Sequence, residues 1–177
     1  SLHMETIYEN ASKSAITTAD RDQKYYNIFA SGEVSSQDFK GGFNAVLEDI
    51  KLNGFNRIIL DLKKVSSTNM SDRAWLVSTY LPELYKAVKD IKIGIINSDG
   101  WFEGGAISLL VTSIQALGFN LGITFFKTVE SAKEKLLAPN QPRDGLTMHE
   151  FRVGISHAGL HILEELVGLL NAGGHHI

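Results

Sequence analysis

The sequence contains no cysteine. This absence excludes a disulfide framework, a thiolate zinc site, an iron–sulfur cluster and cysteine catalysis. Histidine is also missing from most of the chain, because none of the six histidines lies between His3 and His149. The central part of the chain therefore lacks the commonest general base. We accordingly predict a non-enzymatic protein without a metal or other cofactor, in a reducing cytoplasm.

Long hydrophobic runs and long runs of one charge are missing as well. The longest apolar stretches, such as Ile107–Val111, are far shorter than the ~20 residues of a membrane-spanning helix. The N-terminus has no signal-peptide core. With 17 basic and 20 acidic residues the formal charge is −3, which gives no electrostatic footprint for DNA or RNA. We therefore expect no membrane span, no export and no nucleic-acid partner.

What is present suits one globular domain with a short appendage. The 177 residues are 44% hydrophobic and 21% charged, which is enough apolar material for a full core. Residues 1–3 are interpreted as a cloning remnant. Prolines at 139 and 142 mark a change of composition that is typical of a linker. We predict a domain over residues 4–137, a linker over 138–147 and a C-terminal extension over 148–177.

The first part of the domain is predicted to form two strands and a helix. Extended runs at Lys13–Thr18 and Tyr25–Val34, with polar residues between them, predict a hairpin. Ser35 or Ser36 is suited to cap the helix that follows, because apolar residues then recur at helical spacing. The pair Asn53-Gly54 is typical of a helix end.

The rest of the domain is predicted to repeat a strand followed by a helix. Arg57–Leu62 is typical of a strand buried on both faces, and the polar residues 63–69 predict a loop. A helix over Ser71–Val88 should kink at Pro82. The following cycles are a strand Ile91–Ile96 with a helix over about 103–117, and a strand Leu121–Phe126 with a helix Val129–Leu137 capped by Thr128. We expect an α/β fold with a mixed, mainly parallel sheet of about five strands in the order ββαβαβαβα.

With this order in hand, residues 58–71, IILDLKKVSSTNMS, carry a family resemblance. They resemble the characteristic segment of the SpoIIAA-like, or STAS, domains of bacterial regulators, in which a strand ends in Asp-Leu and leads through Val-Ser to a short loop. Asp61, Val65, Ser66 and Ser71 match that pattern. The resemblance implies a SpoIIAA-like fold and places Ser71 where anti-anti-sigma members carry the phosphorylated residue.

Other positions depart from the family pattern. Asn69 replaces its usual acid, Met70 a small hydroxyl residue, and Asp72 the glycine that normally follows. Trp75 and the later Pro82 are familiar in an uncharacterised branch of the family. The chain therefore resembles that branch most.

The candidate site lies where the strand that begins at Arg57 gives way to a helix. Ser66, Ser67, Thr68 and Ser71 place hydroxyls there, at a position where open α/β sheets bind ligands and helix N-termini attract anions. Ser71 either only caps the helix or is a phospho-acceptor. A phosphate on it would meet the helix dipole and the neighbouring Arg73.

Two functions from different classes remain open. The leading hypothesis is a regulatory module that binds a protein partner, with the surface residues Ser66, Ser67, Thr68, Asn69, Arg73, Trp75, Asp99, Trp101 and Phe102. The alternative is a carrier or sensor of a small apolar, lipid-like ligand, held in a pocket of Trp75, Tyr80, Phe102 and Ile107. The aromatic pair Trp101-Phe102 is either an exposed partner surface or a turn that folds back onto the core.

The C-terminal extension also has two interpretations. His157 and His161, four residues apart and followed by Glu164 and Glu165, have a spacing that suits a divalent transition metal. The apolar residues of the predicted helix Ala158–Leu170 cover a wider arc than a surface helix can leave in water. We favour docking of this helix, which predicts a homodimer formed through it.

Overall fold

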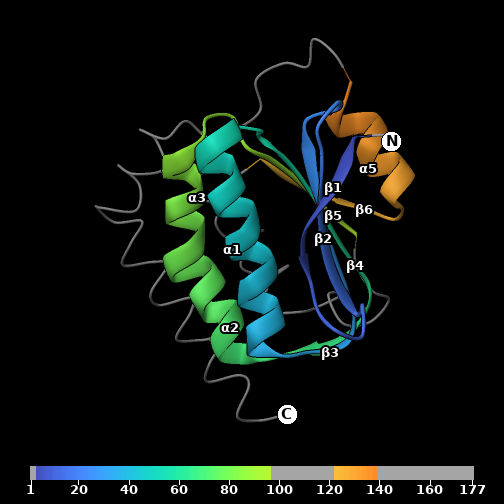
Figure 1. Cartoon of the computed structure of the whole chain (residues 1–177), viewed down its shortest axis with the longest axis vertical. Coiled ribbons are helices and arrows are strands. Elements are labelled where there is room, and N and C mark those ends of the chain that lie inside the picture. The colour runs from blue at the N-terminus through green and yellow to red at the C-terminus, as the bar shows by residue number, and fades with distance from the viewer. Residues whose placement is uncertain (1–2, 97–121, 139–177) are drawn as a thin grey trace.

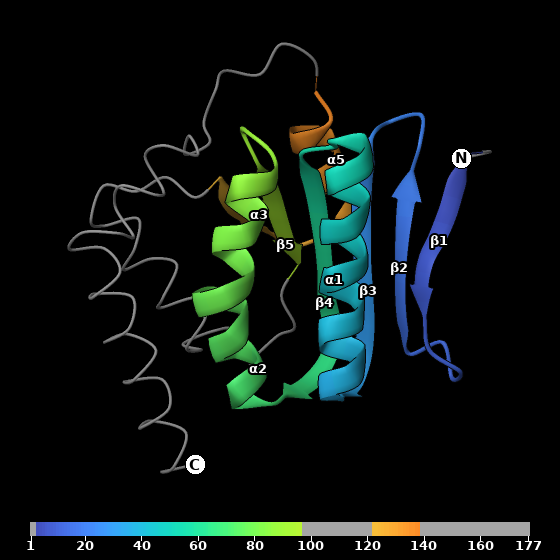
Figure 2. The same cartoon turned by 60° about the vertical axis from the view of Figure 1, so that its left-hand side comes forward.

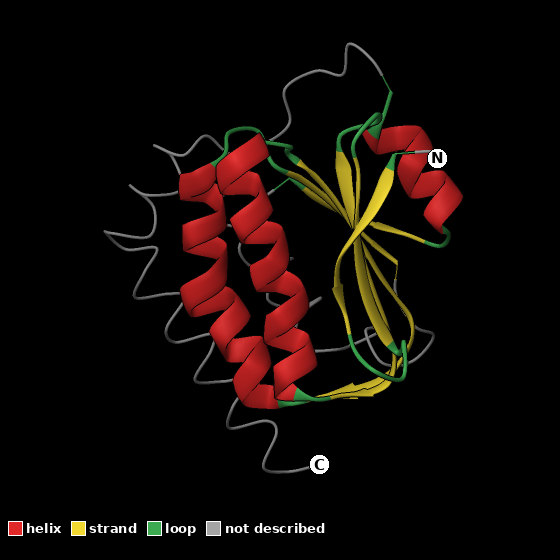
Figure 3. Ribbon diagram, viewed as in Figure 1, coloured by secondary structure: helices red, strands yellow, loops and turns green. Residues whose placement is uncertain are grey.

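The computed structural model describes residues 3–96 and 122–138, and these residues form a sheet with helices on both faces (Figures 1 and 3). The sheet has six strands in the spatial order β1-β2-β3-β4-β5-β6. The strands are β1 (Met4–Glu9), β2 (Ala15–Asp20), β3 (Tyr25–Val34), β4 (Arg57–Thr68), β5 (Lys92–Ile96) and β6 (Ile123–Phe126).

The helices divide between the faces of the sheet. On one face lies α1 (Ser36–Asn53) beside a second helical run, which consists of α2 (Met70–Trp75), the π-helical turn η1 (Leu76–Tyr80) and α3 (Leu81–Ala87) (Figure 2). On the other face α5 (Val129–Leu136) packs against β4, β5 and β6. The described part of the chain is thus a three-layer α/β arrangement.

The sheet is mixed and mainly parallel, as predicted. β1, β2 and β3 pair antiparallel, whereas β3, β4, β5 and β6 pair parallel. The predicted fold class is therefore confirmed, with six strands where we expected about five. The additional strand is β1, which pairs only with β2 among the described strands and keeps most of its side chains exposed. In its sequence, METIYE, the apolar residues do not alternate with polar ones, so the segment gives no strand signal.

Two strands, β2 and β4, extend further than predicted. β2 runs on to Asp20, whose carboxylate accepts hydrogen bonds from the N–H groups of Asp22 and Gln23, so the turn begins after the predicted place. β4 runs on to Thr68, through the residues predicted as a loop, because its polar end pairs with the end of β3. The polar side chains of residues 63–68 are typical of a loop, but pairing with β3 keeps the backbone extended.

The ends of α1 and α5 confirm the predicted caps. The Ser35 hydroxyl accepts from the N–H of Asp38, and Gly54 ends α1 in the left-handed conformation at φ 71°. Thr128 caps α5 through the N–H of Ser131. Each cap supplies a partner to a helix end that has none of its own.

The predicted kink at Pro82 takes the form of a π-helical turn just before it. Leu81 N–H donates to the Leu76 carbonyl oxygen, five residues back, and Pro82 then stands in the first turn of α3. Proline has no N–H, so it cannot donate to the carbonyl of Ser78 as the residue of a regular helix would. The helical run is therefore continuous but carries one extra residue.

The core has a cluster on each face of the sheet. The larger one lies under α1, η1 and α3 and includes Tyr26, Val46, Leu60 and Leu84. The smaller one lies under α5 and includes Tyr25, Ile59 and Leu136. β4 contributes to both, which confirms that it is a strand buried on both faces.

Candidate functional site

The N-terminal ends of α1 and α2 lie side by side at one edge of the sheet (Figure 2). β3 and β4 are parallel neighbours, and their last residues, Val34 and Thr68, are paired. Each strand leads directly into a helix that runs back along the sheet. We call residues 34–38 and 66–73 the α1–α2 start. Such strand-to-helix edges are where open α/β sheets commonly place their functional groups.

Asn69, and not Ser71, caps α2. Its side-chain oxygen accepts hydrogen bonds from the Ser71 N–H at 2.8 Å and from the Ser71 hydroxyl at 2.7 Å. The prediction that Ser71 is the cap is therefore wrong. The side chain of Asn69 accepts the hydrogen bond from an N–H in the first turn of the helix, that of Ser71. Ser71 lies in the first turn of α2 with its side chain exposed.

A buried acid joins the two helices. Asp72 is 1% exposed, and its Oδ2 accepts a hydrogen bond of 2.7 Å from the hydroxyl of Ser36 in the first turn of α1. A hydrogen bond to a charged group contributes about 1.5–3 kcal/mol to stability. We did not predict this contact. The sequence signal at Asp72 is only that of an acid in a first helical turn, and nothing in it points to a partner 36 residues away.

Arg73 links α2 to the last residue of β4 through hydrogen bonds. Its Nη1 donates to both the carbonyl oxygen and the hydroxyl of Thr68, each at 2.9 Å. Burial lowers the pKa of Arg73 below its ordinary value. The structure thus brings together Thr68, Asn69, Ser71 and Arg73, all of which we predicted as site residues.

The other predicted serines belong to the strand that leads into this site. Ser66 is exposed near the end of β4, and Ser67 is half-buried and pairs with Glu33 of β3. Both serines therefore lie in a strand that is paired with β3, and not in a loop as predicted.

Trp75 lies further along the helix and packs toward α1. Its ring centroid is 6.3 Å from that of Phe39 and 5.4 Å from that of Tyr80, and the Lys40 ammonium lies 5.5 Å from its centroid. The Tyr80 hydroxyl donates to the Phe43 carbonyl oxygen at 2.6 Å. Trp75 and Tyr80 of the predicted ligand pocket thus both contact α1.

Several predicted residues lie outside the described ranges. Asp99, Trp101 and Phe102 of the partner surface are among them, as is Ile107 of the ligand pocket. The linker and the C-terminal extension, with its candidate metal ligands and its dimerising helix, also lie outside.

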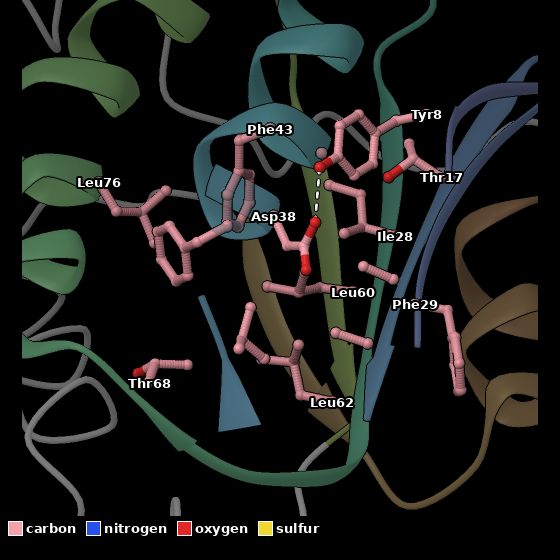
Figure 4. Close-up of a pocket in the computed structure, with 15 residues that line it drawn as sticks. Tyr8, Thr17, Ile28, Phe29, Asp38, Phe43, Leu60, Leu62, Thr68 and Leu76 are labelled. Carbon is pink, nitrogen blue, oxygen red and sulfur yellow. Dashed lines mark hydrogen bonds between the residues drawn. The ribbon is translucent and has the colours of Figure 1, made fainter. Parts of the chain in front are cut away.

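A small apolar cavity lies between α1 and the sheet, next to the α1–α2 start (Figure 4). Its volume of about 40 Å³ has room for about three water molecules, and a cavity that holds benzene is about four times larger. A lipid-like ligand does not fit it. The lining residues are Tyr8, Ala15, Thr17, Ile28, Phe29, Ala30, Val34, Asp38, Phe39, Gly42, Phe43, Leu60, Leu62, Thr68 and Leu76.

β1 closes one side of this cavity through a polar contact with α1. The Tyr8 hydroxyl donates to Asp38 at 2.7 Å, as Figure 4 shows, and the Asn10 amide donates to the same carboxylate at 2.9 Å. The bond from Tyr8 holds the pKa of Asp38 below its ordinary value and raises the pKa of Tyr8 to about 12. We missed this contact because we did not predict β1.

Within the described ranges, no group of three or more His, Asp or Glu side chains is arranged to hold a metal ion. No helix there is both long and apolar enough to cross a bilayer.

Comparisons with known proteins return a structural likeness only. No protein-family model matches the chain, and no curated protein matches it in sequence. Among solved structures, the chain is similar to a candidate anti-sigma factor antagonist from Thermotoga maritima, with 15% sequence identity and a TM-score of 0.46. The match covers 66% of this chain and 90% of that one.

Proposed function

We propose that this protein is a regulatory protein-interaction module whose partner binds at the α1–α2 start and whose binding is controlled by phosphorylation of Ser71. One observation carries the proposal. The exposed hydroxyl of Ser71 adjoins the buried Asp72, which is hydrogen-bonded to Ser36 of α1. A change at an exposed atom is thus one residue away from the contact between the two helices.

Ser71 has the accessibility that a kinase substrate needs. Its side chain is exposed, and the Asn69 side chain accepts a hydrogen bond from the Ser71 backbone N–H. The Ser71 hydroxyl also donates to Asn69, and a phosphorylated oxygen has no proton for that bond. Phosphorylation therefore removes one of the two hydrogen bonds between Ser71 and Asn69 at the start of α2.

The added charge is large for this surface. A phosphoserine carries about −1.5 to −2 charges at neutral pH. It would stand directly beside Asp72, while the Arg73 guanidinium is engaged by Thr68. A partner that fits the unphosphorylated α1–α2 start would then meet an additional anion, and like or desolvated charge at a protein interface weakens binding.

The test uses the tagged full chain expressed in its native cells. We expect phosphopeptide mass spectrometry to find phosphate on Ser71 in part of the protein, and the partner to co-purify with the wild type but not with Ser71→Glu. Asn44→Asp, which adds a charge at an exposed position of α1, is the control and should keep the partner. Recovery of the same partner with Ser71→Glu at wild-type yield would refute the proposal.

A further inference from the structure

The π-helical turn η1 changes which side chains of its helix can face α1. Two contacts fasten the helices together, one from Asp72 to Ser36 and one from Tyr80 to Phe43. On α1 the two contact residues are seven positions apart, about 700° around the axis and so within about 20° of two full turns. On the other helix they are eight positions apart, which in a regular α-helix is about 80° beyond two turns.

The extra residue of η1 absorbs this difference. Because η1 closes a five-residue bond from Leu81 to Leu76, it adds a residue without advancing the helix phase, so Asp72 and Tyr80 both reach α1. Trp75 and Tyr80 show the same effect. They are five residues apart, yet their rings lie 5.4 Å apart beside Phe39 and Phe43 of α1.

A second arrangement of the same segment follows from helix geometry. If η1 straightens into a regular α-helix while Tyr80 stays fixed, α2 turns as a unit by about 80°. This takes Asp72 away from Ser36 and leaves Trp75 about 140° around the helix axis from Tyr80. The cost is the Ser36–Asp72 hydrogen bond and the packing of Trp75 on Phe39 and Lys40. The gain is a regular hydrogen-bond ladder up to Pro82 and a solvated Asp72 carboxylate.

We propose that η1 is a hinge, and that a negative charge on Ser71 rotates α2 about its axis so that Asp72 and Trp75 leave their contact with α1. The charge favours the rotated state because two neighbouring anions repel each other more strongly when one is buried than when both are in water. This inference rests on the proposed function, because phosphorylation of Ser71 is the source of the charge. It adds that the α1–α2 start, where the partner binds, changes its shape.

The test follows Trp75 by ¹⁹F NMR of the full chain labelled with 5-fluorotryptophan, with the Trp75 signal assigned from Trp75→Phe. We expect Ser71→Glu to move the Trp75 signal, whereas Ser71→Gln, which has the same size without the charge, should not move it. Deleting Thr79, an exposed residue of η1, should remove the extra residue and fix α2 in its present orientation. In this background Ser71→Glu should no longer move the signal, while Thr79→Ala should leave the response intact.

Hydrogen exchange supplies a readout that does not depend on the deletion variant. Because the rotated segment loses its contacts with α1 and so opens more often, we expect Ser71→Glu to increase exchange at the amides of residues 72–81 at least tenfold, while those of α1 and β4 stay protected. The proposal is overturned if Ser71→Glu changes neither the Trp75 signal nor this exchange, or if the signal moves equally without Thr79.

The outcomes separate this inference from the proposed function. Loss of the partner with an unmoved Trp75 signal would leave the interaction module standing and refute the hinge. A moved Trp75 signal with an unchanged partner yield would support the hinge and refute the control of partner binding by Ser71.

Discussion

The contact between Ser36 and Asp72 makes a quantitative prediction about stability. Ser36→Ala removes the hydroxyl that donates at 2.7 Å to a carboxylate that is 1% exposed. The carboxylate then stays buried without this donor, so the loss should be that of a hydrogen bond to a charged group, about 1.5–3 kcal/mol. We expect this decrease in the free energy of unfolding, measured by urea denaturation at neutral pH.

A double-mutant cycle separates the hydrogen bond from other effects of the substitution. Once Asp72 is replaced by Ala, Ser36→Ala removes no hydrogen bond and should cost less than about 0.5 kcal/mol, so the coupling energy should exceed about 1 kcal/mol. Ser35→Ala is the matched control, because it removes the cap of α1 at about 1 kcal/mol and should be additive with Asp72→Ala. Additive effects of Ser36→Ala and Asp72→Ala would refute the idea that this bond joins the helices.

Three other predictions concern the cap of α2 and two contacts elsewhere in the fold. Asn69→Ala should lower stability by about 1 kcal/mol and Ser71→Ala by less, since Asn69 is the cap of α2; equal losses in urea denaturation would contradict this assignment. The Arg21 guanidinium lowers the pKa of Asp49 below its ordinary 3.8, so the carboxylate stabilises the fold above that pH and the contribution is lost as the pH falls through the lower folded value. Stability curves between pH 6 and 2 should therefore be flatter for Asp49→Asn than for wild type, and parallel curves would count against the pair. Gly94→Ala would place a methyl group 2.8 Å from Leu136 Cδ1 and 3.1 Å from Phe126 Cε2, so it should cost about 1–3 kcal/mol in thermal unfolding, and less in a Leu136→Ala background, which relieves only the first contact.

Much of the fold could be predicted because it depends on local patterns. The apolar run from Arg57 predicts a strand buried on both faces, and β4 does contribute to a core cluster on each side. Ser35, Gly54 and Thr128 are correctly predicted helix boundaries, since a cap acts on residues within one turn of itself. Alternating strands and helices are enough to predict a mainly parallel sheet.

The misplaced elements are those that distant residues decide. β1 is a strand because β2 lies beside it, and the polar end of β4 is extended because the end of β3 pairs with it. Neither segment carries an apolar alternation of its own. The periodicity of apolar residues indicates which side chains are buried. A strand that is formed mainly by backbone pairing has few buried side chains, so its sequence shows no such periodicity.

The same division applies to the candidate site. By itself, the sequence determined which groups are available at the end of β4, namely Thr68, Asn69, Ser71 and Arg73, because a strand-to-helix junction places them together along the chain. Only the tertiary structure decided that pairing with β3 extends β4 to Thr68, so that the helix begins after Asn69, that Asp72 is buried, and that Ser36 is its partner. The physical reason is that parallel pairing of β3 with β4 sets two helix starts side by side, and the extra residue of η1 then determines which side chains of α2 turn toward α1.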